Sequence, residues 1–96
     1  MQERTVKIKN RLGLHARAAA RFVQCAAQFT SKVQLQRDDK EEIANGKSIL
    51  DVLMLAASNG TTLIIQTDGA DEERAADALV KIVEDRFGEE VSDGLF

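Results

Sequence analysis

The chain has 96 residues, 44% hydrophobic and 30% charged, and this length predicts one domain over residues 1–88. Residues 89–96 form a short acidic tail that we expect to be partly disordered. The formal net charge of −3 gives no basic footprint for nucleic acid, and no segment approaches a signal peptide or the ~20 apolar residues of a membrane span. The single Cys25 cannot form an internal disulfide, and we interpret it as a packing residue. A chain without disulfides suits a reducing compartment, so we expect a cytoplasmic protein.

The first half of the chain predicts a strand, a helix and a hairpin. Thr5–Lys9 alternates polar and apolar residues, as a half-buried strand does. Ala16–Gln28 repeats apolar residues at three- and four-residue spacing and is rich in alanine, which predicts a helix. Lys32–Gln36 alternates again, and Glu42–Ala44 is suited to a short returning strand.

The second half predicts a short helix, a strand and a long helix. Ser48 is a good N-cap with Asp51 three residues on, so the short helix begins there and ends before Asn59. Thr61–Thr67 is rich in β-branched residues and predicts a strand. Acids from Asp71 onward favour the start of the last helix, whose apolar stripe is Ala75, Ala78, Leu79, Ile82 and Val83.

This order of elements is strand, helix, strand, strand, helix, strand, helix. A four-stranded antiparallel sheet with the three helices packed on one face would bury every apolar stripe. The sequence therefore predicts a two-layer α+β domain. It offers no cluster of histidine and cysteine with metal-ligand spacing, so we expect neither a metal nor another cofactor.

His15 is the only histidine and directly precedes the first helix. One interpretation is that it merely caps the helix. Alternatively, a neutral imidazole offers a ring nitrogen as a nucleophile, and the unpaired amides of Ala16 and Arg17 with the helix dipole would stabilise an attached phosphoryl group. The Arg17 guanidinium has a fork suited to phosphate oxygens, and Gly13 gives the preceding turn conformational freedom. The residues alone leave both interpretations open.

Two separated motifs, "LGLHAR" before an alanine-rich helix and "GKSILDVLMLAASNG", resemble the HPr family of histidine-containing phosphocarriers of the phosphoenolpyruvate-dependent phosphotransferase system. The resemblance runs from about Val6 to Val83 and implies an open-faced β-sandwich. It implies that enzyme I phosphorylates His15, that a IIA-type protein takes the group, and that Arg17 orients the phosphate. Ser48 matches the serine that HPr kinase/phosphorylase modifies in part of the family. Such a protein is a substrate of its partners rather than a turnover enzyme.

Ala18 departs from the family pattern, which usually has proline after the arginine. Proline near a helix start fixes φ without losing a hydrogen bond. We therefore expect Ala18 to keep phosphoryl acceptance while loosening the loop.

The predicted short helix is apolar almost all round. Val52, Leu55 and Ala56 can face the core, which leaves other apolar side chains outward as a docking face with a basic rim from Arg17 and Arg21. A deeper core that buries this face is the alternative. The candidate docking residues are Ala20, Arg21, Gln24, Ile49, Leu50 and Leu53.

The function that we infer is a monomeric phosphoryl carrier whose partners are enzyme I, a IIA-type acceptor and, at Ser48, HPr kinase/phosphorylase. A regulatory module of the nitrogen-related branch, signalling by its phosphorylation state without sugar transport, is the first alternative. "NRLGLHAR" and the aspartate pair of "RDDKEE" favour that branch, and "GKSI" favours the kinase-regulated one. An inert α+β domain in which His15 only caps a helix is the second alternative.

Overall fold

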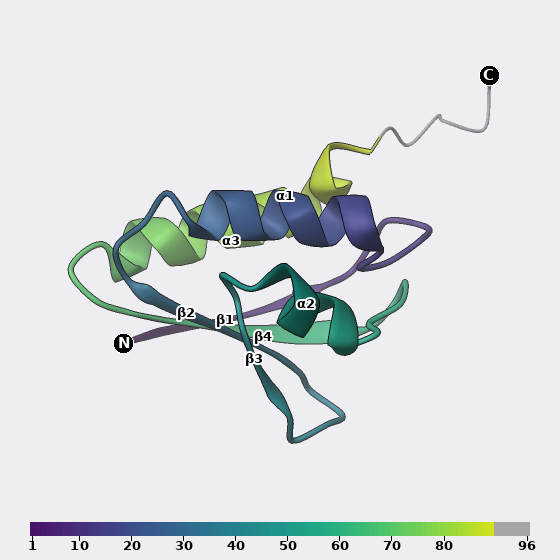
Figure 1. Ribbon diagram of the computed structural model, residues 1–96, viewed down its shortest axis with the longest axis horizontal. Coiled ribbons are helices and arrows are strands. Elements are labelled where there is room, and N and C mark those ends of the chain that lie inside the picture. The colour runs from purple at the N-terminus through teal and green to yellow at the C-terminus, as the bar shows by residue number, and fades with distance from the viewer. Residues whose placement is uncertain (90–96) are drawn as a thin grey trace.

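The computed structural model describes residues 1–89. Over these residues the elements follow the predicted order, with one short 3₁₀ turn, η1, added after the last helix (Figure 1). They are β1 (Gln2–Lys7), α1 (Ala16–Ala26), β2 (Lys32–Arg37), β3 (Ile43–Asn45), α2 (Ile49–Met54), β4 (Thr62–Asp68), α3 (Glu72–Glu84) and η1 (Arg86–Gly88).

The strands form one antiparallel sheet in the order β1-β4-β2-β3. The helices lie together over one face of this sheet, and the other face is open (Figure 1). In β4, Leu63, Ile65 and Thr67 are buried and alternate with partly exposed neighbours, as expected for a sheet covered on one side. The α+β class and the open-faced arrangement are therefore confirmed.

The core lies between the sheet and the helices α1 and α3. Phe22 of α1 and Leu79 of α3 are fully buried there with Leu35 and Ile65 of the sheet. Burying one such large apolar side chain contributes about 1.5–3 kcal/mol. Cys25 is partly buried beside this core, and burial raises the pKa of its thiol, which agrees with a packing role.

Two helix ends differ from the sequence prediction. The first helix ends at Ala26 rather than Gln28. The second ends at Met54, because the chain leaves the helical region at Ala56, whose φ is 51°. Ala56 was expected to face the core, but it is exposed and Ala57 is buried instead. The positive φ of Ala56 changes the direction of the chain, so that Ala57 faces the core.

Asp71 ties the start of α3 to the turn between α1 and β2. Its carboxylate accepts the backbone N–H groups of Thr30 and Ser31 at 3.0 Å each, and also the Ser31 hydroxyl. The Ser31 hydroxyl and these backbone donors lower the pKa of Asp71 to about 2. The acid at this helix start thus joins two connections that are distant in sequence.

A C-terminal strap, residues 86–89, leads back from the end of α3 toward the start of α1 (Figure 1). Arg86, Phe87 and Gly88 all have positive φ, at 57°, 54° and 80°. Such a conformation costs about 1 kcal/mol or more for a residue with a side chain, and the nearly complete burial of Phe87 offsets it. Of the predicted tail, Glu89 belongs to the strap, and residues 90–96 lie outside the described residues.

Candidate functional site

The loop before α1 is pinned to a neighbouring loop. Leu14 N–H donates to the Ala57 carbonyl at 2.9 Å, and the buried Asn10 side chain donates from Nδ2 to the Gly13 carbonyl at 2.8 Å. Gly13 has a φ of 67°, and a Cβ there would lie 2.5 Å from the Ala57 oxygen. Only glycine fits this approach, so Gly13 sets the position from which His15 is presented.

His15 is the N-cap residue of α1, with extended backbone angles of φ −75° and ψ −179°. Its side chain makes no capping hydrogen bond, and the first turn of α1 contains no acidic residue. The first hydrogen bond of the helix runs from Ala19 N–H to the His15 carbonyl at 2.8 Å. The amides of Ala16 and Arg17 precede that bond, so they can donate to an anion at the helix start.

A shallow hollow at this helix start is lined by Leu12, His15, Ala16, Arg17 and Glu89. The His15 side chain is 28% exposed, and Arg17 is exposed beside it. The structure thus brings together the imidazole, the guanidinium and the amides that the sequence singled out. The imidazole is therefore partly exposed at the hollow rather than buried in the core.

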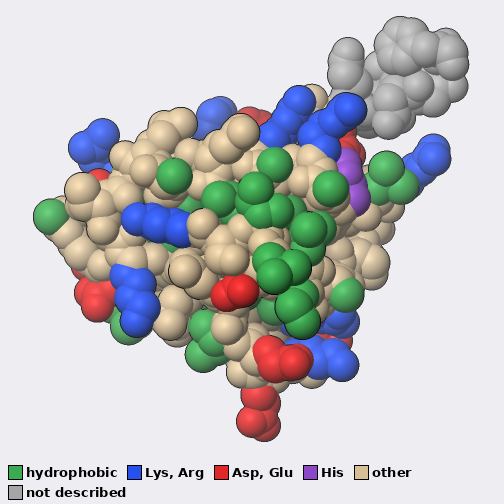
Figure 2. All heavy atoms as spheres, in the orientation of Figure 1, with side chains coloured by type: hydrophobic (Ala, Val, Ile, Leu, Met, Phe, Trp, Pro, Cys, Tyr) green, Lys and Arg blue, Asp and Glu red, His purple; other side chains and the backbone are tan. Residues whose placement is uncertain are grey.

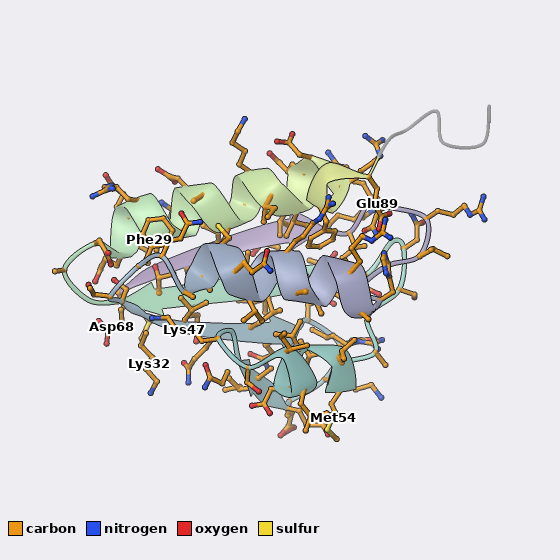
Figure 3. The ribbon with its side chains drawn as sticks, turned by 45° about the horizontal axis from the view of Figure 1, so that its top comes forward. Phe29, Lys32, Lys47, Met54, Asp68 and Glu89 are labelled. Atoms are coloured by element: carbon orange, nitrogen blue, oxygen red, sulfur yellow. The ribbon has the colours of Figure 1, made fainter. Side chains whose placement is uncertain are left out.

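Glu89 is the residue of this hollow that the sequence analysis missed. Its Oε2 pairs with His15 Nε2, and its Oε1 accepts from Asn10 Nδ2 at 3.2 Å. Figure 3 shows Glu89 beside the start of α1, at the end of the strap. Phe87 followed by Gly88 was a partial signal, because phenylalanine is often buried and glycine commonly follows a helix where the chain changes direction.

Arg21, a predicted docking residue, makes a contact that the sequence analysis did not predict. Its Nη1 donates to the Phe87 carbonyl, and the side chain is partly buried. Arg21 therefore anchors the strap, and Arg17 is left as the exposed cation of the predicted basic rim.

Ser48 is the N-cap of α2, as predicted. Its Oγ accepts from Asp51 N–H at 3.3 Å, and Asp51 Oδ2 accepts from Asn45 N–H at 3.3 Å. The residue is partly buried. Its hydroxyl already satisfies an amide of the first turn, next to a carboxylate.

The exposed apolar side chains gather over α1 and α2, which contact each other (Figure 2). Of the predicted docking residues, Gln24, Ile49 and Leu50 are exposed and Ala20 and Leu53 are partly buried. Leu12 and Met54, which the sequence analysis omitted, are 62% and 75% exposed. Met54 lies four residues after Leu50 and could have been placed on the same helix face. We call Leu12, Ala20, Ile49, Leu50, Leu53 and Met54 the apolar face. Gln24 is a polar predicted docking residue on α1.

The fold and the site define a class: an open-faced β-sandwich that presents one histidine at an exposed helix start. Residues 2–85 match the family model described as PTS HPr component phosphorylation site. The chain belongs to the HPr family of phosphocarrier proteins of the phosphotransferase system.

Individual relatives agree with this assignment. The phosphocarrier protein HPr of Cupriavidus necator is 46% identical over 93% of this chain and 98% of its own. HPr-like protein Crh of Halalkalibacterium halodurans is 42% identical over 88% of this chain and 98% of its own. The crystal structure of HPr from Thermoanaerobacter tengcongensis superposes with a TM-score of 0.87 at 45% identity, covering 95% of this chain and all of that one.

Proposed function

We propose that this protein accepts a phosphoryl group on His15 from enzyme I and passes it to a IIA-type protein. One observation carries the proposal: the His15 side chain does not cap the first amides of α1, and it lines the same hollow as Arg17. An imidazole nitrogen attacks the phosphorus while the donor's bond to phosphorus breaks, and the donor atom leaves with the bonding electron pair. The free amides and Arg17 then hold the phosphoryl oxygens.

The shallow site suits a carrier. A group that must be loaded by one protein and unloaded by another has to be reached in line at the phosphorus each time. A deeply closed site would protect the phosphoryl group but would block the second partner. The protein is thus a substrate of its partners and not a turnover enzyme.

Incubation with phosphoenolpyruvate and enzyme I tests the proposal. We expect one acid-labile phosphate on the wild-type chain and none on His15→Ala. A folded wild-type chain that takes up no phosphate would favour the inert-domain alternative. Transfer onward is measured by adding a IIA-type protein to the purified phosphorylated carrier.

The apolar face is the surface that we assign to these partners. It adjoins the His15 hollow through Leu12, and Arg17 gives its edge a positive charge that favours acidic partners. Leu50→Glu should raise the KM for enzyme I, while Ile64→Glu on the open face of the sheet should not. We place the carrier in the cytoplasm as a monomer. HPr of T. tengcongensis has also been solved as a dimer, so the oligomeric state is to be measured by sedimentation.

Regulatory phosphorylation of Ser48 by HPr kinase/phosphorylase is part of the proposal. A phosphate on this residue would lie at the start of α2, which supports negative charge through the helix dipole. Incubation with ATP and the kinase should give an acid-stable phosphate that is lost in Ser48→Ala. Without incorporation, Ser48 would be a helix cap only.

Signalling without sugar transport is the second candidate function. The similarity to HPr-like protein Crh favours a regulatory role. Crh of Bacillus subtilis is described as a catabolite repression protein. Full transfer from His15 to a sugar-specific IIA protein would favour the transport role, and transfer only to a nitrogen-related IIA protein would favour regulation.

A further inference from the structure

The strap holds Glu89 in a defined place. Arg21 binds the Phe87 carbonyl, and the Phe87 ring is 1% exposed in the core. Two successive residues with side chains, Arg86 and Phe87, adopt the left-handed conformation that turns the chain back. A structure keeps such a conformation only where surrounding contacts enforce it. The packing of Phe87 and the contact with Arg21 therefore fix the position of Glu89 in the hollow.

Both carboxylate oxygens of Glu89 are engaged. Oε2 pairs with His15 Nε2, and Oε1 accepts from Asn10 Nδ2. Asn10 is itself 1% exposed and donates its other amide hydrogen to the Gly13 carbonyl at 2.8 Å. The carboxylate is thus fixed to the same loop that presents the imidazole, and the Glu89 side chain is only 17% exposed.

We propose that Glu89 is a positioning residue for His15, a role that rests on the proposed carrier function. Its carboxylate accepts the Nε2–H hydrogen bond and so favours the tautomer in which Nδ1 carries the lone pair. Nδ1 makes no hydrogen bond within residues 1–89. When Nδ1 forms its bond to phosphorus, the donor's bond to phosphorus breaks and the ring gains positive charge. The Nε2 proton stays on the ring, where the carboxylate stabilises that charge.

A purely obstructive role for Glu89 is the opposite interpretation. A carboxylate near an incoming phosphoryl group repels it, and its removal would then accelerate loading. Two features favour positioning. Glu89 contacts Nε2 rather than Nδ1, and Arg17 lines the same hollow, where its positive charge offsets that of the carboxylate. The two roles predict opposite changes in rate.

Steady-state transfer from enzyme I separates these roles, with the carrier as the varied substrate. Glu89→Ala should lower kcat/KM about tenfold, mainly through kcat. This is the low end of the loss seen when the hydrogen-bond partner of a metal-bound histidine is removed. Glu89→Gln keeps an acceptor for Nε2–H without the charge and should lie between Ala and wild type. Glu84→Ala removes an exposed acid near the end of α3 and should match wild type.

Nitrogen-15 NMR of the His15 ring gives a readout that a structural role would not move. At a pH where the imidazole is neutral, the wild type should show the Nε2–H tautomer, and Glu89→Ala a mixture. An unchanged tautomer or an equal or higher rate in folded Glu89→Ala would overturn the proposal. If the wild type takes no phosphate, the carrier function fails, and the tautomer measurement still decides whether Glu89 orients the ring.

Discussion

The starts of α1 and α2 differ in what already occupies their backbone amides. At α1 the His15 side chain is turned to Glu89, and the first turn carries no acid. At α2 the Ser48 hydroxyl accepts from the backbone, and Asp51 adds a carboxylate to the first turn. An anion can therefore bind at the start of α1 without displacing a cap. At the start of α2 it must replace one. A carboxylate lies near both sites: Glu89 lines the hollow at α1, and Asp51 is in the first turn of α2.

The capped start of α2 thus stabilises the helix, whereas the uncapped start of α1 leaves its amides free to bind a phosphoryl group. Each helix start has backbone N–H groups without a partner inside the helix, at the positive end of a helix dipole. The capping side chain decides which role follows, because a bonded hydroxyl satisfies a donor that a phosphate would otherwise meet.

The largest expected effect follows from the cation at the start of α1. Arg17→Ala should lower kcat/KM for phosphorylation of His15 about 100-fold, since it removes a charged donor to the transferring group. Arg17→Lys should recover part of the rate, because it keeps the charge without the planar fork. Arg74→Ala, which removes an exposed arginine of α3, is the matched control. Equal rates for Arg17→Ala and wild type would exclude this role.

The start of α3 offers a third case, because Asp71 there accepts hydrogen bonds from the turn between α1 and β2 and caps no amide of its own helix. Asp71→Asn should lower the midpoint of thermal unfolding by several degrees near neutral pH. The folded-state pKa of Asp71 is lowered from 3.8 to about 2, so its contribution is present above about pH 4 and is lost as the pH falls through about 2. The difference between wild type and variant should therefore shrink on acidification. Glu73→Gln, an exposed acid of the same helix, should show no such trend.

Substitution of Ser48 should reduce stability more than substitution of His15, although His15 is the residue needed for phosphate uptake. Ser48→Ala removes a helix cap and should lower the free energy of unfolding by about 1 kcal/mol in urea titrations. His15→Ala removes no capping bond but leaves Glu89 Oε2 without its partner, so the two variants are compared in a Glu89→Ala background. There His15→Ala should cost less than Ser48→Ala, although it abolishes phosphate uptake from enzyme I. A larger stability loss for His15→Ala than for Ser48→Ala would contradict this assignment.

Local patterns were enough to predict the helices and strands but not the strap. The spacing of Phe22 in the first helix and Leu79 in the last marks the faces that are buried. The motif around His15 likewise identifies the hollow from sequence. Glu89 and Arg21 could not be placed this way, because their partners lie 74 and 66 residues away along the chain. Those contacts depend on how Phe87 packs, which is a property of the tertiary structure.

A smaller effect tests the carboxylate at the start of α2. Asp51→Asn should raise the rate of Ser48 phosphorylation by the kinase about twofold to threefold, because it removes a like charge from the first turn. Asp38→Asn, at an exposed turn, is the control for net charge. A lower rate in Asp51→Asn would mean that the kinase itself recognises Asp51.

The smallest effect is expected at Ala18, where the family resemblance implies proline. The Ala18 amide precedes the first helical hydrogen bond, so Ala18→Pro should keep phosphoryl acceptance and raise the free energy of unfolding by about 0.5 kcal/mol. Ala19→Pro is the contrasting variant, since Ala19 N–H donates to the His15 carbonyl at 2.8 Å and its loss costs about 3 kcal/mol. If Ala18→Pro stays folded but takes no phosphate, the Ala18 amide itself must bind the phosphoryl group, and alanine here would be a functional substitution.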